Sequence, residues 1–186
     1  LHCFDEVLLF EHREGIMMKR IYRFLTIGLV LVVLGAGYFF TNLTIFDRVL
    51  IQLNTSQKLS YIPFENRLNM QCDKADNLVP KLASSRFHLI TWNVHKGQDT
   101  GWQEDLERLS KQADFVLLQE ATQHQNLSTF STALFVSSFS FKDLLSGVKT
   151  FTKTQPEWYC GGGVAEPIIQ IPKVASVMNF PLEKGN

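Results

Sequence analysis

The sequence predicts an α/β domain preceded by one transmembrane helix. A long uncharged run lies near the N-terminus, from Phe24 to Phe46. Further along, an amphipathic helical pattern separates two short apolar runs, 87–92 and 115–119. Apolar run, helix and apolar run in this order are typical of a right-handed crossover between parallel strands. We therefore expect a membrane-associated helix first and a sheet-containing domain after it.

Charge and cysteine content leave the substrate open. The 18 Lys and Arg residues balance 18 Asp and Glu residues, so no positive excess indicates a nucleic-acid partner. Neutrality does not exclude one, because a bound metal can supply positive charge. Cys3, Cys72 and Cys160 lack the spacing of a structural zinc site. Cys72 and Cys160 can form a disulfide if the domain lies outside the cytoplasm.

Residues 1–16 begin without methionine and are followed by Met17 and Met18. We expect residues 1–16 to be an over-extended reading frame, and residues 17–46 to be the membrane segment. A helix over residues 24–46 rises roughly 35 Å, enough to cross a bilayer.

Basic residues precede the apolar run, at Lys19, Arg20 and Arg23. The positive-inside rule predicts a single-pass protein of the inner (cytoplasmic) membrane, with its N-terminus inside and its domain extracytoplasmic. Two alternatives stay open. The small residues Gly35, Ala36 and Gly37 also fit a cleaved signal peptide of a secreted protein. The run could instead be a helix of a soluble cytoplasmic protein.

Residues 47–83 show no sustained period and contain two prolines. We interpret them as a linker with one short helix before Asn54, leading to a domain over residues 84–186. Within that domain, residues 122–145 carry Leu127, Phe130 and Leu134 at a spacing that fits a helix packed on the sheet. The glycines at 161–163 indicate a flexible turn.

The first strand of the domain covers residues 87–92 and the second covers 115–119. Between them, Thr100 and Gln103 have the spacing of a capping box at a helix start. The apolar face of this helix consists of Trp102, Leu106, Leu109 and Ala113.

Asn93 and Glu120 follow directly on these two strands. Parallel strands end on the same edge of a sheet, which is where α/β proteins usually bind ligands. A carboxylate there can hold Mg²⁺, and a neighbouring amide can orient a phosphate oxygen or a bound water. Taken singly, Asn93 is equally compatible with a turn residue, and Glu120 with a solvated acid at a helix start.

Two histidines are candidates for further contacts. His95 lies in the loop after Asn93 and could contact a substrate. His124 follows Glu120 at a helical spacing that could pair the two on a metal, although its polar neighbours also fit a surface histidine.

The letters TWN at 91–93 and LLQE at 117–120 resemble the first two motifs of the endonuclease/exonuclease/phosphatase superfamily. Residues 146–160 and 166–182 resemble the strands that follow in that superfamily, most closely in its YafD-like bacterial branch. The resemblance covers residues 84–186. It implies the N-terminal part of a four-layer α/β sandwich of the deoxyribonuclease I type.

The resemblance also implies roles. Asn93 would organise the phosphate site, and Glu120 would bind a catalytic Mg²⁺. The complete protein would hydrolyse phosphodiesters or phosphomonoesters, as a nuclease or as a phosphodiesterase acting on phospholipid. The sequence ends at Asn186 without the later catalytic His, the GDFN-type motif or the SDH-type motif of that superfamily.

We therefore expect a truncated, metal-dependent phosphoesterase whose present chain is inactive. One alternative is a membrane-tethered, non-catalytic binding module that keeps half of the fold. Another is a small independent α/β domain over residues 84–186 whose motif matches arise by chance. The sequence predicts no oligomeric state.

Overall fold

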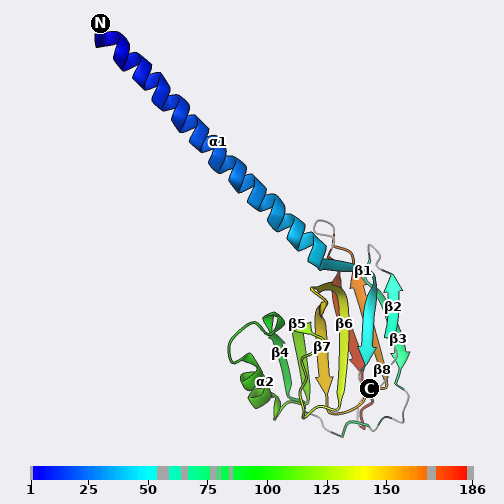
Figure 1. Ribbon diagram of the computed structural model, residues 1–186. Coiled ribbons are helices and arrows are strands. Elements are labelled where there is room, and N and C mark those ends of the chain that lie inside the picture. The colour runs from blue at the N-terminus through cyan, green and yellow to red at the C-terminus, as the bar shows by residue number, and fades with distance from the viewer. Residues whose placement is uncertain are drawn as a thin grey trace. The chain divides into compact units, whose positions relative to one another are not determined.

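The computed structural model describes residues 2–53, 59–63, 67–75, 79, 81–83, 86–166 and 171–183, apart from the side chains of 2–17 and 59–62. The chain divides into two compact units, Leu1–Asn42 and Leu43–Asn186. Figure 1 shows the order of their elements along the chain.

The first unit is the helix α1, His2–Asn42. Its portion Met18–Asn42 has a mean hydropathy of 2.1 and none of it is buried within the protein, so it is long and apolar enough to cross a membrane. An anchor and a signal sequence both fit this finding. The side chains of Thr41 and Asn42 bond back to the carbonyl oxygens of Gly37 and Tyr38, which satisfies acceptors in the last turn.

The helix ends four residues earlier than the apolar run 24–46 predicts. Leu43–Phe46 belong to a strand instead, because Leu43, Thr44 and Ile45 pair with Phe141, Ser140 and Phe139. The side chains of residues 1–16 lie outside the described residues. Whether this segment is an over-extended reading frame therefore stays a prediction.

The second unit contains two sheets. Its six-stranded sheet has the order β2-β1-β6-β7-β5-β4, and its three-stranded sheet has the order β3-β8-β9. The strands are β1 Leu43–Leu53, β2 Leu59–Pro63, β3 Asn69–Lys74, β4 Leu89–Asn93, β5 Phe115–Thr122, β6 Thr132–Phe141, β7 Leu144–Thr152, β8 Trp158–Val164 and β9 Lys173–Asn179. The short 3₁₀ helix η1, His95–Gly97, and the helix α2, Trp102–Ser110, lie between β4 and β5. Helices and sheets together agree with the predicted α/β class.

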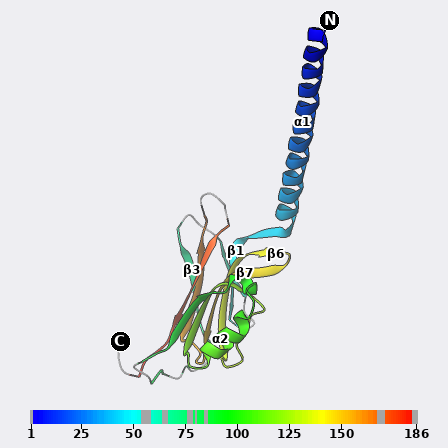
Figure 2. The ribbon, with the colours of Figure 1, turned by 90° about the vertical axis from the view of Figure 1, so that its left-hand side faces the viewer.

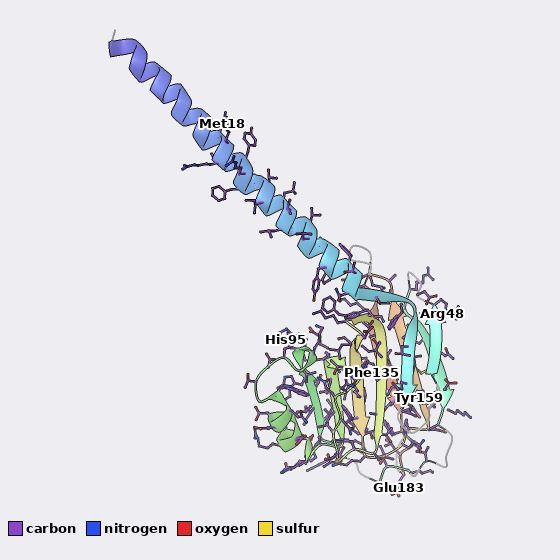
Figure 3. All side chains as sticks on the ribbon, viewed as in Figure 1. Met18, Arg48, His95, Phe135, Tyr159 and Glu183 are labelled. Atoms are coloured by element: carbon purple, nitrogen blue, oxygen red, sulfur yellow. A yellow bond between two sulfur atoms is a disulfide. The ribbon has the colours of Figure 1, made fainter. Side chains whose placement is uncertain are left out.

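The large sheet buries an apolar cluster on each of its faces. On one face α2 inserts Leu106 against residues of β5 and β7 such as Val116 and Phe151. On the other face the small sheet contributes Tyr159, which packs on Ile51 and other residues of β1 and β6. Figure 2 shows α2 and β3 on opposite sides of the large sheet, and Figure 3 labels Tyr159 and Phe135 within the packed region.

The interpretation of residues 47–83 as a linker is wrong. β1 pairs with β6 and β2, and β3 pairs with β8, so this segment supplies strands to both sheets. The short helix expected before Asn54 is part of β1, with Val49, Ile51 and Leu53 buried. Its partner β6 lies 81 to 98 residues further along the chain, and such a long-range pairing leaves no local signal.

The crossover between β4 and β5 is confirmed. The two strands are parallel, with Trp92 opposite Leu118 and Asn93 opposite Gln119. The prediction of a capping box is wrong. The N-cap of α2 is Gly101, in a left-handed conformation, and no side chain forms a capping hydrogen bond at this helix start. Of the predicted apolar face, Leu106 is buried and Trp102 packs against the same core cluster, whereas Leu109 is exposed. The buried Ala113 lies beyond the end of α2.

Residues 122–145 form no helix. Thr132–Phe141 and Leu144–Thr152 make a hairpin whose turn residues, Lys142 and Asp143, both have positive φ. The prediction of a flexible turn at 161–163 is wrong as well, because these glycines lie inside β8. A Cβ added to Gly161 would come within 2.5 Å of Ile51 Cγ1, so glycine permits the two sheets to approach closely.

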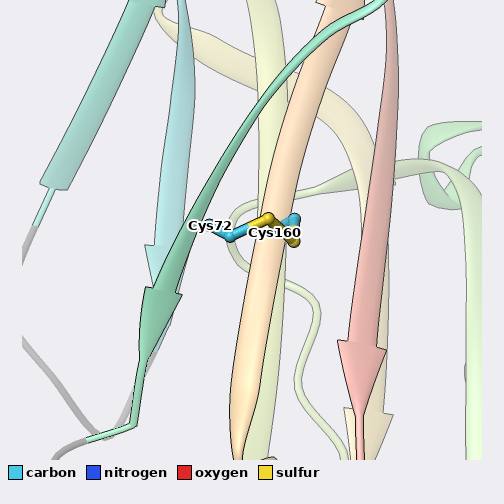
Figure 4. The surroundings of a disulfide bond; sticks show 2 residues. All are labelled: Cys72 and Cys160. Atoms are coloured by element: carbon cyan, nitrogen blue, oxygen red, sulfur yellow. A yellow bond between two sulfur atoms is a disulfide. The ribbon is translucent and has the colours of Figure 1, made fainter.

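Cys72 of β3 and Cys160 of β8 form a disulfide (Figure 4). They lie opposite each other in the register of these two strands. The bond therefore joins a strand from the supposed linker to the middle of the small sheet, 88 residues away along the chain.

Candidate functional site

Glu120 lies at an irregularity in β5. The register between β5 and β7 shifts between Leu118 and Ala121, and Glu120 within that bulge has a φ of 49°. A left-handed backbone is unfavourable for a residue with a side chain by roughly 1–2 kcal/mol. Such conformations persist where the surrounding structure holds them, and they cluster at functional sites.

The side chain of Glu120 is held by two partners. Asn93 Nδ2 donates to Glu120 Oε1 at 3.0 Å, and Lys96 Nζ donates to Glu120 Oε2 at 2.8 Å. The backbone N–H of His95 donates to Asn93 Oδ1 at 3.0 Å, which fixes the orientation of that amide. The predicted juxtaposition of Asn93 and Glu120 is therefore present, and it includes a third residue, Lys96.

The tight loop after β4 brings Lys96 back to Glu120. Val94 is buried and its N–H bonds to the carbonyl of Gln119, so the loop starts from a fixed point on β5. His95, Lys96 and Gly97 then all have positive φ. A Cβ on Gly97 would lie 2.9 Å from the Trp102 ring, so this close contact also requires glycine.

The electrostatics of Glu120 follow from these contacts. Hydrogen bonding from Lys96, and then from Asn93, lowers the pKa of the Glu120 carboxyl, against a smaller opposing effect of burial. Its side chain is 41% exposed, so the lowered pKa belongs to a carboxylate that water and solutes can reach.

Glu120 and Lys96 line a cavity of about 320 Å³ between the two sheets. Glu166 and Lys173 line the same cavity, and their charged groups lie 3.6 Å apart. Gly147 of β7 contributes to its wall. Each of the two carboxylates is therefore paired with a lysine, and these charges balance within a cavity whose other lining is largely apolar.

Sequence reasoning missed Lys96, Glu166 and Lys173. Lys96 could have been found from its place in the loop beside Asn93. Glu166 and Lys173 carry no comparable signal, because they lie in the small sheet and its approach, which only the tertiary fold brings to this edge.

The two histidines differ in their relation to Glu120, because the charge of His95 contributes a little to lowering the pKa of the Glu120 carboxyl. His95 Nδ1 is 3.5 Å from Asp99 Oδ1, and its side chain is 57% exposed. His124 is exposed and contacts Gln123. The proposed helical pairing of Glu120 with His124 is wrong, since Glu120 is in a strand and His124 in the turn that follows it.

Within the described ranges, no group of three or more His, Cys, Asp or Glu side chains is placed to hold a metal ion. The site at Glu120 combines one carboxylate with the amide of Asn93 and the ammonium of Lys96. It can bind a cation through Glu120 and an anion through Lys96.

Curated proteins similar to this chain carry the name UPF0294 protein. One from Klebsiella pneumoniae (strain 342) is 32% identical over 108 residues, which cover 55% of this chain and 41% of that protein. UPF0294 proteins of Yersinia pseudotuberculosis and Yersinia pestis are each 31% identical over 121 residues, covering 62% of this chain and 46% of theirs. The chain thus spans less than half the length of these relatives. No family model and no solved structure matches it.

These findings correct the assignment to the endonuclease/exonuclease/phosphatase superfamily and its YafD-like branch. The relatives are UPF0294 proteins, and no family model or solved structure supports that superfamily. The motifs TWN and LLQE are short. Strands that end in a polar residue at a sheet edge produce similar strings in many α/β proteins.

We predict that replacing Lys96 by methionine raises the pKa of Glu120 toward its ordinary value, because the largest cause of its lowering is then gone. A carboxyl whose pKa is lowered by folding stabilises the protein above the ordinary glutamate pKa, and this stability is lost as the pH falls through the lowered value. In K96M this contribution should shrink, so the stability of the variant should depend less on pH in this acidic range. ¹³C NMR titration of the glutamate carboxyl carbons in the full chain, in detergent micelles, measures the pKa directly.

Lys111→Met is the matched control, since Lys111 is exposed in the turn after α2. If Glu120 titrates with the same pKa in wild type, K111M and K96M, Lys96 does not hold the carboxylate.

Proposed function

We propose that Asn93, Lys96 and Glu120 form the metal- and phosphate-binding part of a site for phosphate esters. The observation that carries the proposal is the bulge at Glu120. A strained backbone turns a carboxylate into an accessible cavity at the carboxyl ends of a parallel strand pair, where an amide and an ammonium meet it. The proposal rests on this geometry and on no family assignment.

The donor set fits Mg²⁺ held by one protein carboxylate. Mg²⁺ usually keeps several waters and takes other ligands from one or two carboxylates and from substrate phosphates. Glu120 Oε2 already has a cation as its partner, the Lys96 ammonium at 2.8 Å. A metal ion would take the place of that cation. When bound, Mg²⁺ would neutralise charge on the phosphate and polarise its oxygens.

The residues of the chain would then have separate tasks. Glu120 would hold the metal through the oxygen now bonded to Lys96. Lys96, released from that oxygen, would place its ammonium against a phosphate oxygen. Asn93 would keep its bond to the other Glu120 oxygen and so fix the carboxylate. The His95 N–H, by holding Asn93, would be a positioning group for the whole arrangement.

Hydrolysis also needs a group that activates water, and the two groups bonded to the Glu120 carboxylate, an amide and an ammonium, are not bases. We therefore propose that the present chain binds metal and phosphate without turnover, as a truncated form of a phosphoesterase. Hydrolysis of a phosphodiester or phosphomonoester is a proposal for the whole protein. The alternative is a non-catalytic binding module that keeps half of the fold. A site with a single carboxylate favours it, because such a site can bind metal and phosphate without turnover.

We also propose that a longer form of the protein completes a four-layer α/β sandwich. Three layers are accounted for by α2, the large sheet and the small sheet. Val177 of β9 is 42% exposed, and a further helical layer over the small sheet would cover such residues.

The proposed metal site predicts that Mn²⁺, a paramagnetic substitute for Mg²⁺, binds one site on the full chain in detergent micelles. Glu120→Gln should weaken Mn²⁺ binding at least about tenfold, because the amide lacks the negative charge. Asn93→Asp should strengthen it, because a second carboxylate then lies beside the first. Electron paramagnetic resonance of free Mn²⁺ measures both effects.

Glu104→Gln, on the exposed side of α2, is the control and should leave Mn²⁺ binding unchanged. Equal binding by wild type and E120Q would contradict the metal site. Mn²⁺- or Mg²⁺-dependent hydrolysis of bis(p-nitrophenyl) phosphate by the chain, lost in E120Q, would contradict the claim that it is inactive.

For location, we propose a single-pass inner-membrane protein with its N-terminus inside and its domain outside the cytoplasm. Lys19, Arg20 and Arg23 precede the apolar part of α1, which favours this orientation. The disulfide between Cys72 and Cys160 supports it independently, since such bonds persist in oxidising compartments. Extracytoplasmic nucleic acid or phospholipid would then be the available substrates.

This location predicts the state of the cysteines in bacterial cells. In a Cys3→Ser variant, acid quenching and alkylation under denaturing conditions should label neither Cys72 nor Cys160 unless a reductant is added first. Labelling of both without reductant would place the domain in the cytoplasm. Recovery of the protein in the soluble fraction, with α1 removed, would instead indicate a cleaved signal peptide.

A further inference from the structure

Lys149 of β7 is a buried cation outside the site at Glu120. Its residue is only 7% exposed. Successive strand residues point to opposite faces of a sheet. Accordingly Val148 lines the cavity that contains Glu120, whereas Lys149 lines a separate cavity of about 270 Å³ on the α2 side of the large sheet. The two cavities share no lining residue among those described.

The ammonium of Lys149 is held by backbone oxygens. It donates to the carbonyl of Gln123 at 3.0 Å and to that of Gln125 at 2.5 Å. It also lies over the rings of Phe135 and Phe151, at 5.6 and 5.4 Å from their centroids. An ammonium has three donors, so these bonds leave one N–H for another acceptor. Burial lowers the pKa of Lys149 to about 8, and the group stays mostly protonated at neutral pH.

Gln125 lines the same cavity and carries a second unused donor. Its residue is 7% exposed, and its Nε2 is a buried atom without a hydrogen-bond partner. The orientation of this amide is fixed, because Oε1 accepts from the N–H of Thr122 at 2.9 Å, and a backbone N–H requires an oxygen there. The end of the amide that is left without a partner is therefore an N–H₂ group, and not an oxygen.

The lining of the cavity selects the charge of a ligand. Besides Lys149 and Gln125 it consists of Gln52, Gln123, Asn126, Ala133 and Phe135. Lys149 is thus the one ionisable side chain among the described residues that line it. A single positive charge with unused donors beside it is complemented by one negative charge on an oxygen acceptor. An unpaired buried donor is unfavourable, and such a ligand would satisfy both donors at once.

We propose that this cavity binds a singly charged oxyanion group, of the carboxylate or phosphodiester type, between Lys149 and Gln125. The ring of Phe135, on the strand next to Lys149, offers an apolar wall for the rest of the ligand. The size of the cavity fits a small molecule or one group of a larger one. This site is independent of the metal site proposed at Glu120.

The test uses acetate and dimethyl phosphate as probes of the two chemical types, added to the full chain in detergent micelles. Saturable shifts of the Lys149 ammonium signal in ¹H–¹⁵N spectra are expected with at least one probe. Lys149→Met should abolish binding. Gln125→Glu should weaken it at least about tenfold, because an internal carboxylate then meets the ammonium. The glutamate retains an oxygen for the Thr122 N–H, so this variant should remain folded.

Lys153→Met is the matched control: it removes one lysine near the end of the same hairpin, but an exposed one, and should bind both probes as wild type does. A preference for acetate would identify a carboxylate ligand, and a preference for dimethyl phosphate a phosphodiester. No saturable shift with either probe would overturn the proposal. So would equal binding by wild type and Q125E, with thermal unfolding showing both to be folded.

Discussion

The parallel pairing of β4 with β5 is the constraint on which the candidate site depends. Pairing Asn93 with Gln119 sets the two strand ends at one edge of the sheet, and the bulge after Leu118 then turns Glu120 toward Asn93. The loop at His95–Gly97 is anchored on β5 by Val94, so Lys96 reaches the same carboxylate. A change of one residue in this register would move Asn93 to the other face of the sheet and separate all three groups.

β7 connects the two proposed sites. It lies between β6 and β5, and its alternating residues face the small sheet on one side and α2 on the other. At Gly147, β7 lies so close to β6 that an added Cβ would come within 1.9 Å of the Val136 carbonyl oxygen. One well-packed strand therefore supplies part of the wall of the Glu120 cavity and the buried cation of the other cavity.

Local patterns in the sequence predict the crossover and the meeting of Asn93 with Glu120, because the strand, helix and strand involved are neighbours in the chain. They fail where pairing is long-range or where turn chemistry is unusual. Within residues 47–83, β1 and β3 pair with β6 and β8, whose residues lie 81 to 98 positions further along the chain. The hairpin after Thr132 turns through Lys142 and Asp143, which lack the glycine that usually marks such turns. Lys96 could have been found from its place in the loop beside Asn93. Lys149 could not be recognised as a site residue, because burial and hydrogen bonding set its role.

The proposed role of Glu120 is to hold a metal ion beside Asn93. Anomalous diffraction from crystals of the full chain soaked in Mn²⁺ would locate that ion. We expect an anomalous peak roughly 2.1 Å from a Glu120 carboxylate oxygen, with Lys96 Nζ moved away from Oε2 and the Asn93 bond to Oε1 retained. A well-ordered Glu120 that still pairs with Lys96, with no anomalous peak in the cavity at saturating Mn²⁺, would contradict it.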